Sequence, residues 1–302
     1  MKRKGFTLVE LLVVIAIIAL LMGILMPALA RVRQLAFRMV CGTNLAGIGK
    51  AMLIYANDYD DELPRAGGRL SQWDGPVIWN ANNRYTAYGV SQSDGSGGKA
   101  TITSCFFLLV KYAEVTPKSF VCKGDTGTNE WQLAQETTVT TGFEMIDAWD
   151  FGATPRDNCS YSYHLPFGQY ALTTSSEPGL AVASERNPWL PSPAGAAGVF
   201  GDFMPDVRPF TGTTETALKG NAASHQGEGQ NVLFLDAHVE FARRAFCSLE
   251  DDNIFTRSRN ATTGDPLGTM PAYSTTFAPM NRKDSLLVHD PDAFTTSTRT
   301  GR

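Results

Sequence analysis

The chain has 302 residues and a mass of 32.8 kDa, enough for one large domain or two small ones. Its mean hydropathy of −0.13, with 28 glycines and 16 prolines, excludes both a polytopic membrane protein and a disordered chain. A net charge of −4 argues against a protein built mainly to bind nucleic acid. The charge is uneven, because residues 1–40 carry six basic residues against one acidic residue, which leaves the other 262 residues at −9.

An apolar segment near the N-terminus is long enough to cross a membrane. From Leu11 to Ala30 there are 20 uncharged residues, which in a helix span about 30 Å, the thickness of the hydrocarbon core of a bilayer. A helix suits this environment because it satisfies its own backbone groups. The basic residues 2–4 place the N-terminus in the cytoplasm, although three arginines just beyond the segment weaken that bias.

Two residues do not fit an ordinary membrane anchor. Glu10 stands at the start of the apolar run, where a charged carboxylate costs on the order of 3 kcal/mol. Such a charge is usually retained for a partner. Pro27 falls inside the helical pattern, where it removes one hydrogen bond and predicts a kink or local melting.

The segment from Lys4 to Leu12 (KGFTLVELL), followed by the apolar run, resembles the class III signal of type IV prepilins and type II secretion pseudopilins. The resemblance implies that a prepilin peptidase cleaves between Gly5 and Phe6 and N-methylates Phe6, while the helix is kept. It also implies that Glu10 pairs with the N-terminal amine of a neighbouring subunit during assembly. An ammonium and a carboxylate in apolar surroundings cost far less together than alone.

Two other interpretations of this segment stay open. A conventional secretory signal peptide is one, because Ala28-Leu29-Ala30 satisfies the small-x-small cleavage rule. A plain uncleaved anchor is the other. The apolar run is longer than the usual ~7 to 15 residues of a signal peptide, and Glu10 lies in it, so we favour the prepilin signal.

The helical pattern continues beyond the membrane segment. Apolar residues recur at three- and four-residue steps from Val32 to Tyr59 and predict one helix of about 50 residues that stops before Pro64. Glycines at 42, 47 and 49 either weaken it by about 1 kcal/mol each or permit close packing against a sheet or other helices. The predicted organisation is a leader (1–5), a transmembrane and assembly helix (6–30), its amphipathic continuation (31–62) and an exported globular domain (63–302).

The body is predicted to be loop-rich, with a few recognisable elements. These are a short buried helix at 106–112, strands at 160–163 and 180–184, and a hairpin at 231–241 with a two-residue turn at Asp236-Ala237. After residue 251 the chain is polar, with one apolar anchor at 286–288 and an end at 295–302 that we expect to fray. The fold class is α+β and pilin-like: a long N-terminal α-helix packed on an antiparallel β-sheet with long loops.

A second resemblance concerns the C-terminal half. His225, Asn231 and Asp236 resemble the His-x9-Asp-Gly signature of large pseudopilin-like families of planctomycete-type bacteria, a motif to which we assign no role. Two departures from the signature are present. Ten residues separate His225 from Asp236, and Ala237 replaces the glycine.

Few residues suggest chemistry. His225, Asp236, His238 and Glu185 are the one group that resembles a metal or acid–base constellation. The simpler interpretation is that Asp236 caps the hairpin and His225 hydrogen-bonds a loop. No nucleophile elbow, His-Glu-x-x-His helix or paired Cys-x-x-Cys motif occurs, so we expect no enzyme activity.

No cofactor is expected, with calcium as the single exception. The resemblance to type II secretion pseudopilins suggests a calcium ion in a C-terminal loop, bound by oxygen ligands. Carboxylates that are available for it are those of Asp202, Asp206, Glu228 and Asp236.

The cysteines are five, at 41, 105, 122, 159 and 247. In an oxidising compartment an odd number permits up to two disulfides and leaves one thiol over. We favour Cys122–Cys159, because both residues flank loop-rich segments.

The predicted function is structural: a subunit of a type IV pilus-like filament or a type II secretion pseudopilus. The chain is expected to cross the inner membrane once, with its body in the periplasm or exported in a filament. Its expected partners are prepilin peptidase, other pilin or pseudopilin subunits, the inner-membrane assembly platform and the membrane, but no nucleic acid. The alternative is a membrane-tethered or filament-tip binding protein, such as an adhesin, that uses a prepilin-type anchor.

Overall fold

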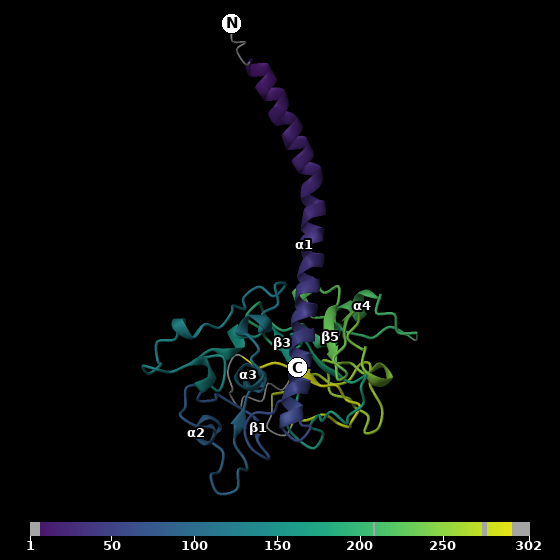
Figure 1. Ribbon diagram of the computed structural model, residues 1–302. Coiled ribbons are helices and arrows are strands. Elements are labelled where there is room, and N and C mark those ends of the chain that lie inside the picture. The colour runs from purple at the N-terminus through teal and green to yellow at the C-terminus, as the bar shows by residue number, and fades with distance from the viewer. Residues whose placement is uncertain (1–6, 208, 274–276, 292–302) are drawn as a thin grey trace.

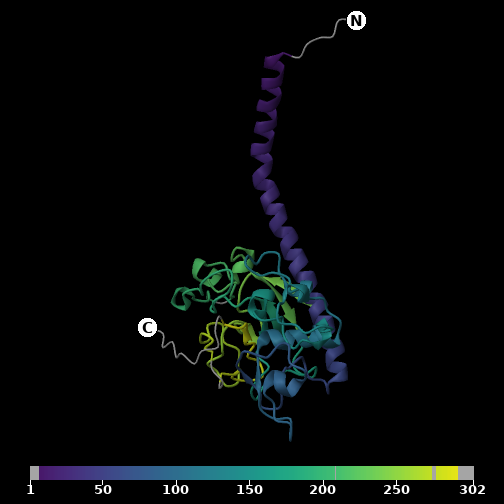
Figure 2. The same cartoon turned by 90° about the vertical axis from the view of Figure 1, so that its left-hand side faces the viewer.

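The computed structural model describes residues 7–207, 209–273 and 277–291, and it shows one long helix that stands out of a globular body (Figure 1). This helix, α1 (Leu8–Asp58), runs for 51 residues, which confirms the prediction of a single helix of about 50 residues. Its second half lies along one side of the body and its first half projects free of it (Figure 2). Pro27 lies inside α1, which continues through it as an unbroken helix. α1 bends within its projecting first half (Figures 1 and 2), so of the predicted kink or local melting the structure shows a bend and no melting.

The body is built on a five-stranded antiparallel sheet with the strand order β6-β5-β4-β3-β7. Its strands are β3 (Tyr161–His164), β4 (Ala181–Glu185), β5 (Gln230–Phe234), β6 (Val239–Ala242) and β7 (Leu287–Val288). The first four confirm the predicted strands and hairpin, and β7 is the predicted apolar anchor. The α+β, pilin-like arrangement of a long helix on an antiparallel sheet is therefore confirmed.

Strands β3, β4, β5 and β7 are buried on both faces of the sheet, and the edge strand β6 is partly exposed. Successive side chains of a strand point to opposite faces, so Leu233 packs toward α1, while Val232 and Phe234 join a second apolar cluster on the far side. That second cluster includes Trp189 and Phe255, which come from loops. This explains why the sequence from Val232 to Leu235 is a continuous apolar run and not an alternating one.

Two glycines let α1 approach the sheet closely. A Cβ atom on Gly49 would lie 2.5 Å from Cδ1 of Leu233, and one on Gly42 would lie 3.0 Å from Oδ1 of Asn231. Gly47 is exposed, with nothing within 4 Å of such an atom. Close packing against a sheet is therefore the role of Gly42 and Gly49, but not of Gly47.

The hairpin turn is one residue longer than predicted. Phe234 N donates to His238 O at 3.0 Å, so Leu235, Asp236 and Ala237 form a three-residue connection. Ala237 has φ +66°, the left-handed residue that such connections require. Asp236 Oδ1 accepts from His238 N at 3.1 Å, which confirms that Asp236 caps the hairpin.

The remaining elements are short and lie around this frame. The predicted helix at 106–112 is α3 (Ile102–Tyr112), which begins earlier because Thr101 caps it by accepting from Ser104 N. The end at 295–302 lies outside the described residues. The other helices and strands are α2 (Arg84–Tyr88), α4 (Glu215–Leu218), a parallel pair β1 (Gln72–Trp73) and β2 (Lys99–Ala100), and the 3-10 turns η1 (Pro117–Phe120), η2 (Leu133–Gln135), η3 (Met145–Asp147), η4 (Pro155–Asn158), η5 (Phe200–Asp202), η6 (Ala223–His225) and η7 (Leu249–Asp251).

Candidate functional site

The first functional feature is the uncovered half of α1. Large apolar side chains from Leu8 to Met39 are exposed, and none of the most apolar 18-residue window of α1 is buried. In the part of the chain that the structure describes, α1 alone is long and apolar enough to cross a membrane. An apolar surface of this size is not stable in water and requires lipid or protein around it.

The helix begins with a capping box. Thr7 Oγ1 accepts from Glu10 N at 3.3 Å, and Glu10 Oε2 accepts from Thr7 N at 2.8 Å. The pattern Thr-x-x-Glu before an apolar run is a recognised helix start, so Thr7 and Glu10 mark this boundary in the sequence itself. Glu10 thus has a local role in the single chain. Gly5 and Phe6, the residues of the predicted cleavage and methylation, lie outside the described residues.

The second feature is a buried cluster where α1 meets the sheet. His225 Nε2 lies 3.0 Å from Glu185 Oε1, with an imidazole N–H donating to the carboxylate, and both side chains are buried. Asn231 donates to the same carboxylate through its backbone N (2.6 Å) and through Nδ2 (2.8 Å). Asn231 Nδ2 also lies 3.2 Å from the carbonyl oxygen of Arg38 on α1.

The fold explains why these residues meet. Glu185 ends β4 and Asn231 lies on the neighbouring strand β5, one position beyond the pair Ser184 and Val232. His225 ends η6, and its ring packs on Gly124, where a Cβ atom would lie 2.9 Å from Nδ1. A side chain at position 124 would therefore displace the imidazole.

The predicted metal or acid–base constellation is only half correct; its four members were His225, Asp236, His238 and Glu185. His225 and Glu185 meet, but Asp236 and His238 lie at the exposed hairpin tip, where they pair with each other. Their separation follows from the hairpin, because its turn lies at the opposite end of β5 from Asn231.

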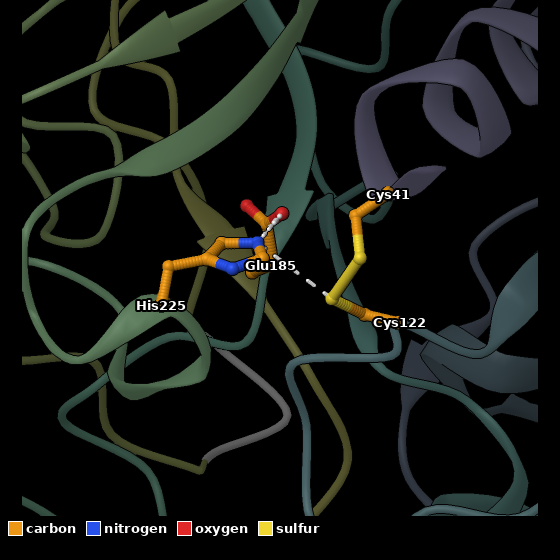
Figure 3. Close-up of side chains that lie close together, drawn as sticks. All are labelled: Cys41, Cys122, Glu185 and His225. Carbon is orange, nitrogen blue, oxygen red and sulfur yellow. Dashed lines mark hydrogen bonds and ion pairs between the residues drawn. A yellow bond between two sulfur atoms is a disulfide. The ribbon is translucent and has the colours of Figure 1, made fainter. Parts of the chain in front are cut away.

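A disulfide lies directly beside this cluster. Cys41 of α1 is bonded to Cys122, whose Sγ is 3.7 Å from His225 Nε2 (Figure 3). The predicted Cys122–Cys159 pairing is therefore wrong. Cys159 is a free buried thiol, and burial raises its pKa to about 12. The partner of Cys122 could not be found from the sequence, because the pairing depends on how α1 lies against the body.

The four carboxylates nominated for calcium have separate neighbours. Glu228 pairs with Arg38, whose hydrogen bond lowers the pKa of Glu228. Asp206 accepts from Thr211 Oγ1 at 2.7 Å, Asp236 pairs with His238, and Asp202 lies on η5. Among the described residues these carboxylates form no common group, and calcium binding stays a prediction.

The comparisons with known proteins agree with the features of α1. Residues 1–26 match the family model of the prokaryotic N-terminal methylation motif, which is the signal of prepilins and pseudopilins. The chain therefore carries a prepilin-type N-terminal signal, and its long helix on an antiparallel sheet is a pilin-like arrangement. The motif implies processing by prepilin peptidase and assembly with other pilin subunits. No curated protein and no solved structure matches the chain, and the likeness of its C-terminal motif to planctomycete-type families stays a prediction.

Proposed function

We propose that the protein is a structural subunit of a type IV pilus-like filament or a type II secretion pseudopilus. It is cleaved between Gly5 and Phe6, methylated on Phe6, stored in the inner membrane and assembled through α1. The observation that carries this proposal is the bare apolar half of α1, which projects from the body with Glu10 near its start.

The same apolar surface serves both storage and assembly. In the membrane it contacts lipid, and in a filament it contacts the helices of neighbouring subunits, so extraction does not expose it to water. In such a bundle the carboxylate of Glu10 is not hydrated, and the N-terminal ammonium of a neighbouring subunit stabilises its charge. That pair sets the stagger between subunits, and the inner-membrane assembly platform supplies the place where they meet.

Two observations support a body outside the cytoplasm. Residues 2–4 are all basic and favour a cytoplasmic N-terminus. The body carries the Cys41–Cys122 disulfide, and disulfides persist in oxidising compartments.

Mass spectrometry of the mature protein tests the processing step. We expect an N-terminus at Phe6 that carries one methyl group. An N-terminus at Arg31 would instead identify a conventional secretory signal peptide, and an intact Met1 would identify a plain anchor. Either result overturns the proposal, because assembly requires the helix to be kept and its amine to be freed.

The variant Glu10→Gln tests the assembly step. Because glutamine cannot compensate the ammonium of a neighbour, we expect filament yield to fall about tenfold or more while membrane insertion is unchanged. Glu240→Gln, which removes an exposed charge from β6, is the control and should assemble normally. Filaments of Glu10→Gln at the wild-type level would show that the proposed pairing is wrong.

A further inference from the structure

We propose that Cys41, Cys122, Glu185 and His225 form a structural zinc site when the Cys41–Cys122 disulfide is reduced. In this proposal α1 is cross-linked to the body in one of two ways: by the disulfide in the oxidised state, or by a bound Zn²⁺ in the reduced state. This inference depends on the body alone and not on filament assembly.

The ligand atoms already lie at nearly the required separations. One ligand atom from each of the four residues lies within 4.8 Å of all the others. Zn²⁺ bonds of ~2.0–2.3 Å in a tetrahedron place neighbouring ligand atoms ~3.3–3.8 Å apart. Cys122 Sγ is 3.7 Å from His225 Nε2, which is 3.0 Å from Glu185 Oε1. After reduction the two sulfur atoms need only move apart by rotation of their side chains.

The surroundings hold the ligands in place. Two hydrogen bonds from Asn231 fix the carboxylate of Glu185, as is usual for metal-bound carboxylates. Gly124 seats the ring of His225. Figure 3 shows the four side chains converging from α1, from the end of β4, from η6 and from the loop of Cys122.

The chemistry of the ligands favours zinc. Two thiolates, one imidazole and one carboxylate form a mixed set that suits tetrahedral Zn²⁺. Calcium requires six to eight oxygen ligands, and this site offers one carboxylate. All four residues are buried, which leaves no open position for a substrate and indicates a structural site.

The disulfide and the zinc-bound state interconvert by a two-electron exchange. A dithiol reductant gives two electrons and two protons to the disulfide, which becomes two thiols, while the reductant becomes a disulfide. Binding of Zn²⁺ then releases the two thiol protons to solvent. His225 binds through Nε2 as a neutral imidazole with its proton on Nδ1, and Glu185 binds as a carboxylate. A disulfide oxidant that takes two electrons from the thiolates reverses the process and releases Zn²⁺.

Cobalt binding to the full chain in detergent micelles tests the proposal. Co²⁺ that is bound by thiolates in a tetrahedral site gives strong visible absorption bands. After reduction with a phosphine, we expect one equivalent of Co²⁺ to bind with these bands and to be displaced by Zn²⁺. The oxidised protein should show none. Reduced protein without the bands, or equal binding to the oxidised protein, would overturn the proposal.

Variants assign the binding to the four residues. Glu185→Gln and His225→Ala should each weaken Co²⁺ binding about tenfold or more, whereas Cys159→Ala, which removes a buried thiol outside the group, should bind as the wild type does. Recovery of the Cys41–Cys122 disulfide on reoxidation shows which variants are folded. Glu185→Gln, the more conservative change, decides the matter if His225→Ala does not fold. A folded Glu185→Gln with wild-type affinity, or a folded Cys159→Ala without binding, contradicts the assignment.

Discussion

At the scale of single residues, the body contains carboxyl groups that are fully enclosed. Asp150 Oδ2 accepts from Thr101 Oγ1 at 2.6 Å and from Thr103 Oγ1 at 3.1 Å, and its Oδ1 accepts from Phe151 N at 2.8 Å. Burial raises the pKa of Asp150 to about 7, and the nearby Asp290 adds to the increase. The charged form of Asp150 therefore costs free energy in the folded state, because desolvation outweighs the three hydrogen bonds.

Asp150→Asn should change how stability depends on pH. Because the pKa of Asp150 is higher folded than unfolded, its contribution to stability is present below about pH 4 and is lost as pH rises through about 7. Between these limits we expect the variant to gain on the order of 2 kcal/mol relative to the wild type. Chemical denaturation of both proteins at several pH values measures this gain.

Asp94→Asn is the control for this experiment. Asp94 lies on an exposed loop, where hydrogen bonds from Ser91 and Ser96 lower its pKa to about 2. Its folded pKa lies below the pH window of the experiment and its unfolded pKa of about 3.9 lies at the lower edge of the window, so Asp94 is charged in both states above about pH 5. The stability difference between this variant and the wild type should stay constant there. A constant difference for Asp150→Asn as well would mean that Asp150 is charged at no cost.

At the scale of elements, α1 was the most predictable part of the chain and its contact with the sheet the least. Apolar spacing predicted α1, two strands and the hairpin, because each pattern is local. The Cys41–Cys122 pairing and the meeting of Glu185 with His225 were not found, since both depend on where α1 and η6 lie against the sheet. The glycines showed that close packing was available, but only the structure separates Gly49 from Gly47.

Gly49→Val should loosen the contact between α1 and the sheet. Its side chain would overlap Leu233, and overpacking of this kind costs about 1–3 kcal/mol, more than the helix propensity gained on losing glycine. We expect a lower unfolding temperature of the body in detergent micelles. Gly47→Val, on the exposed side of α1, should stay within about 0.5 kcal/mol of the wild type. Equal unfolding temperatures for the two variants would show that the sheet yields to the added side chain.

At the scale of the whole molecule, a residue near the end of the described chain joins distant segments. Asp290 accepts from Trp73 Nε1 and Ile102 N, each at 2.9 Å, and from Thr103 N at 2.8 Å. It therefore satisfies the first two backbone donors of α3 and the indole donor of Trp73 on β1. Composition and spacing do not reveal such a contact, because nothing local distinguishes Asp290 from the other acidic residues of a polar segment.

Asp290→Ala should accordingly destabilise the body as a unit. The substitution leaves three buried donors without this acceptor, and each unsatisfied donor costs about 1–3 kcal/mol. Part of this cost is offset, because the substitution also removes an enclosed carboxyl group, whose pKa is raised by burial. We expect a net loss of about 3 kcal/mol in chemical denaturation, with α3 and the segment around β1 becoming sensitive to protease together. Asp94→Ala breaks only hydrogen bonds within its own exposed loop. This variant should leave the protease sensitivity of α3 and of the segment around β1 unchanged. If Asp290→Ala exposed only the end of the chain to protease, the contact would be a local anchor and would not hold the three segments together.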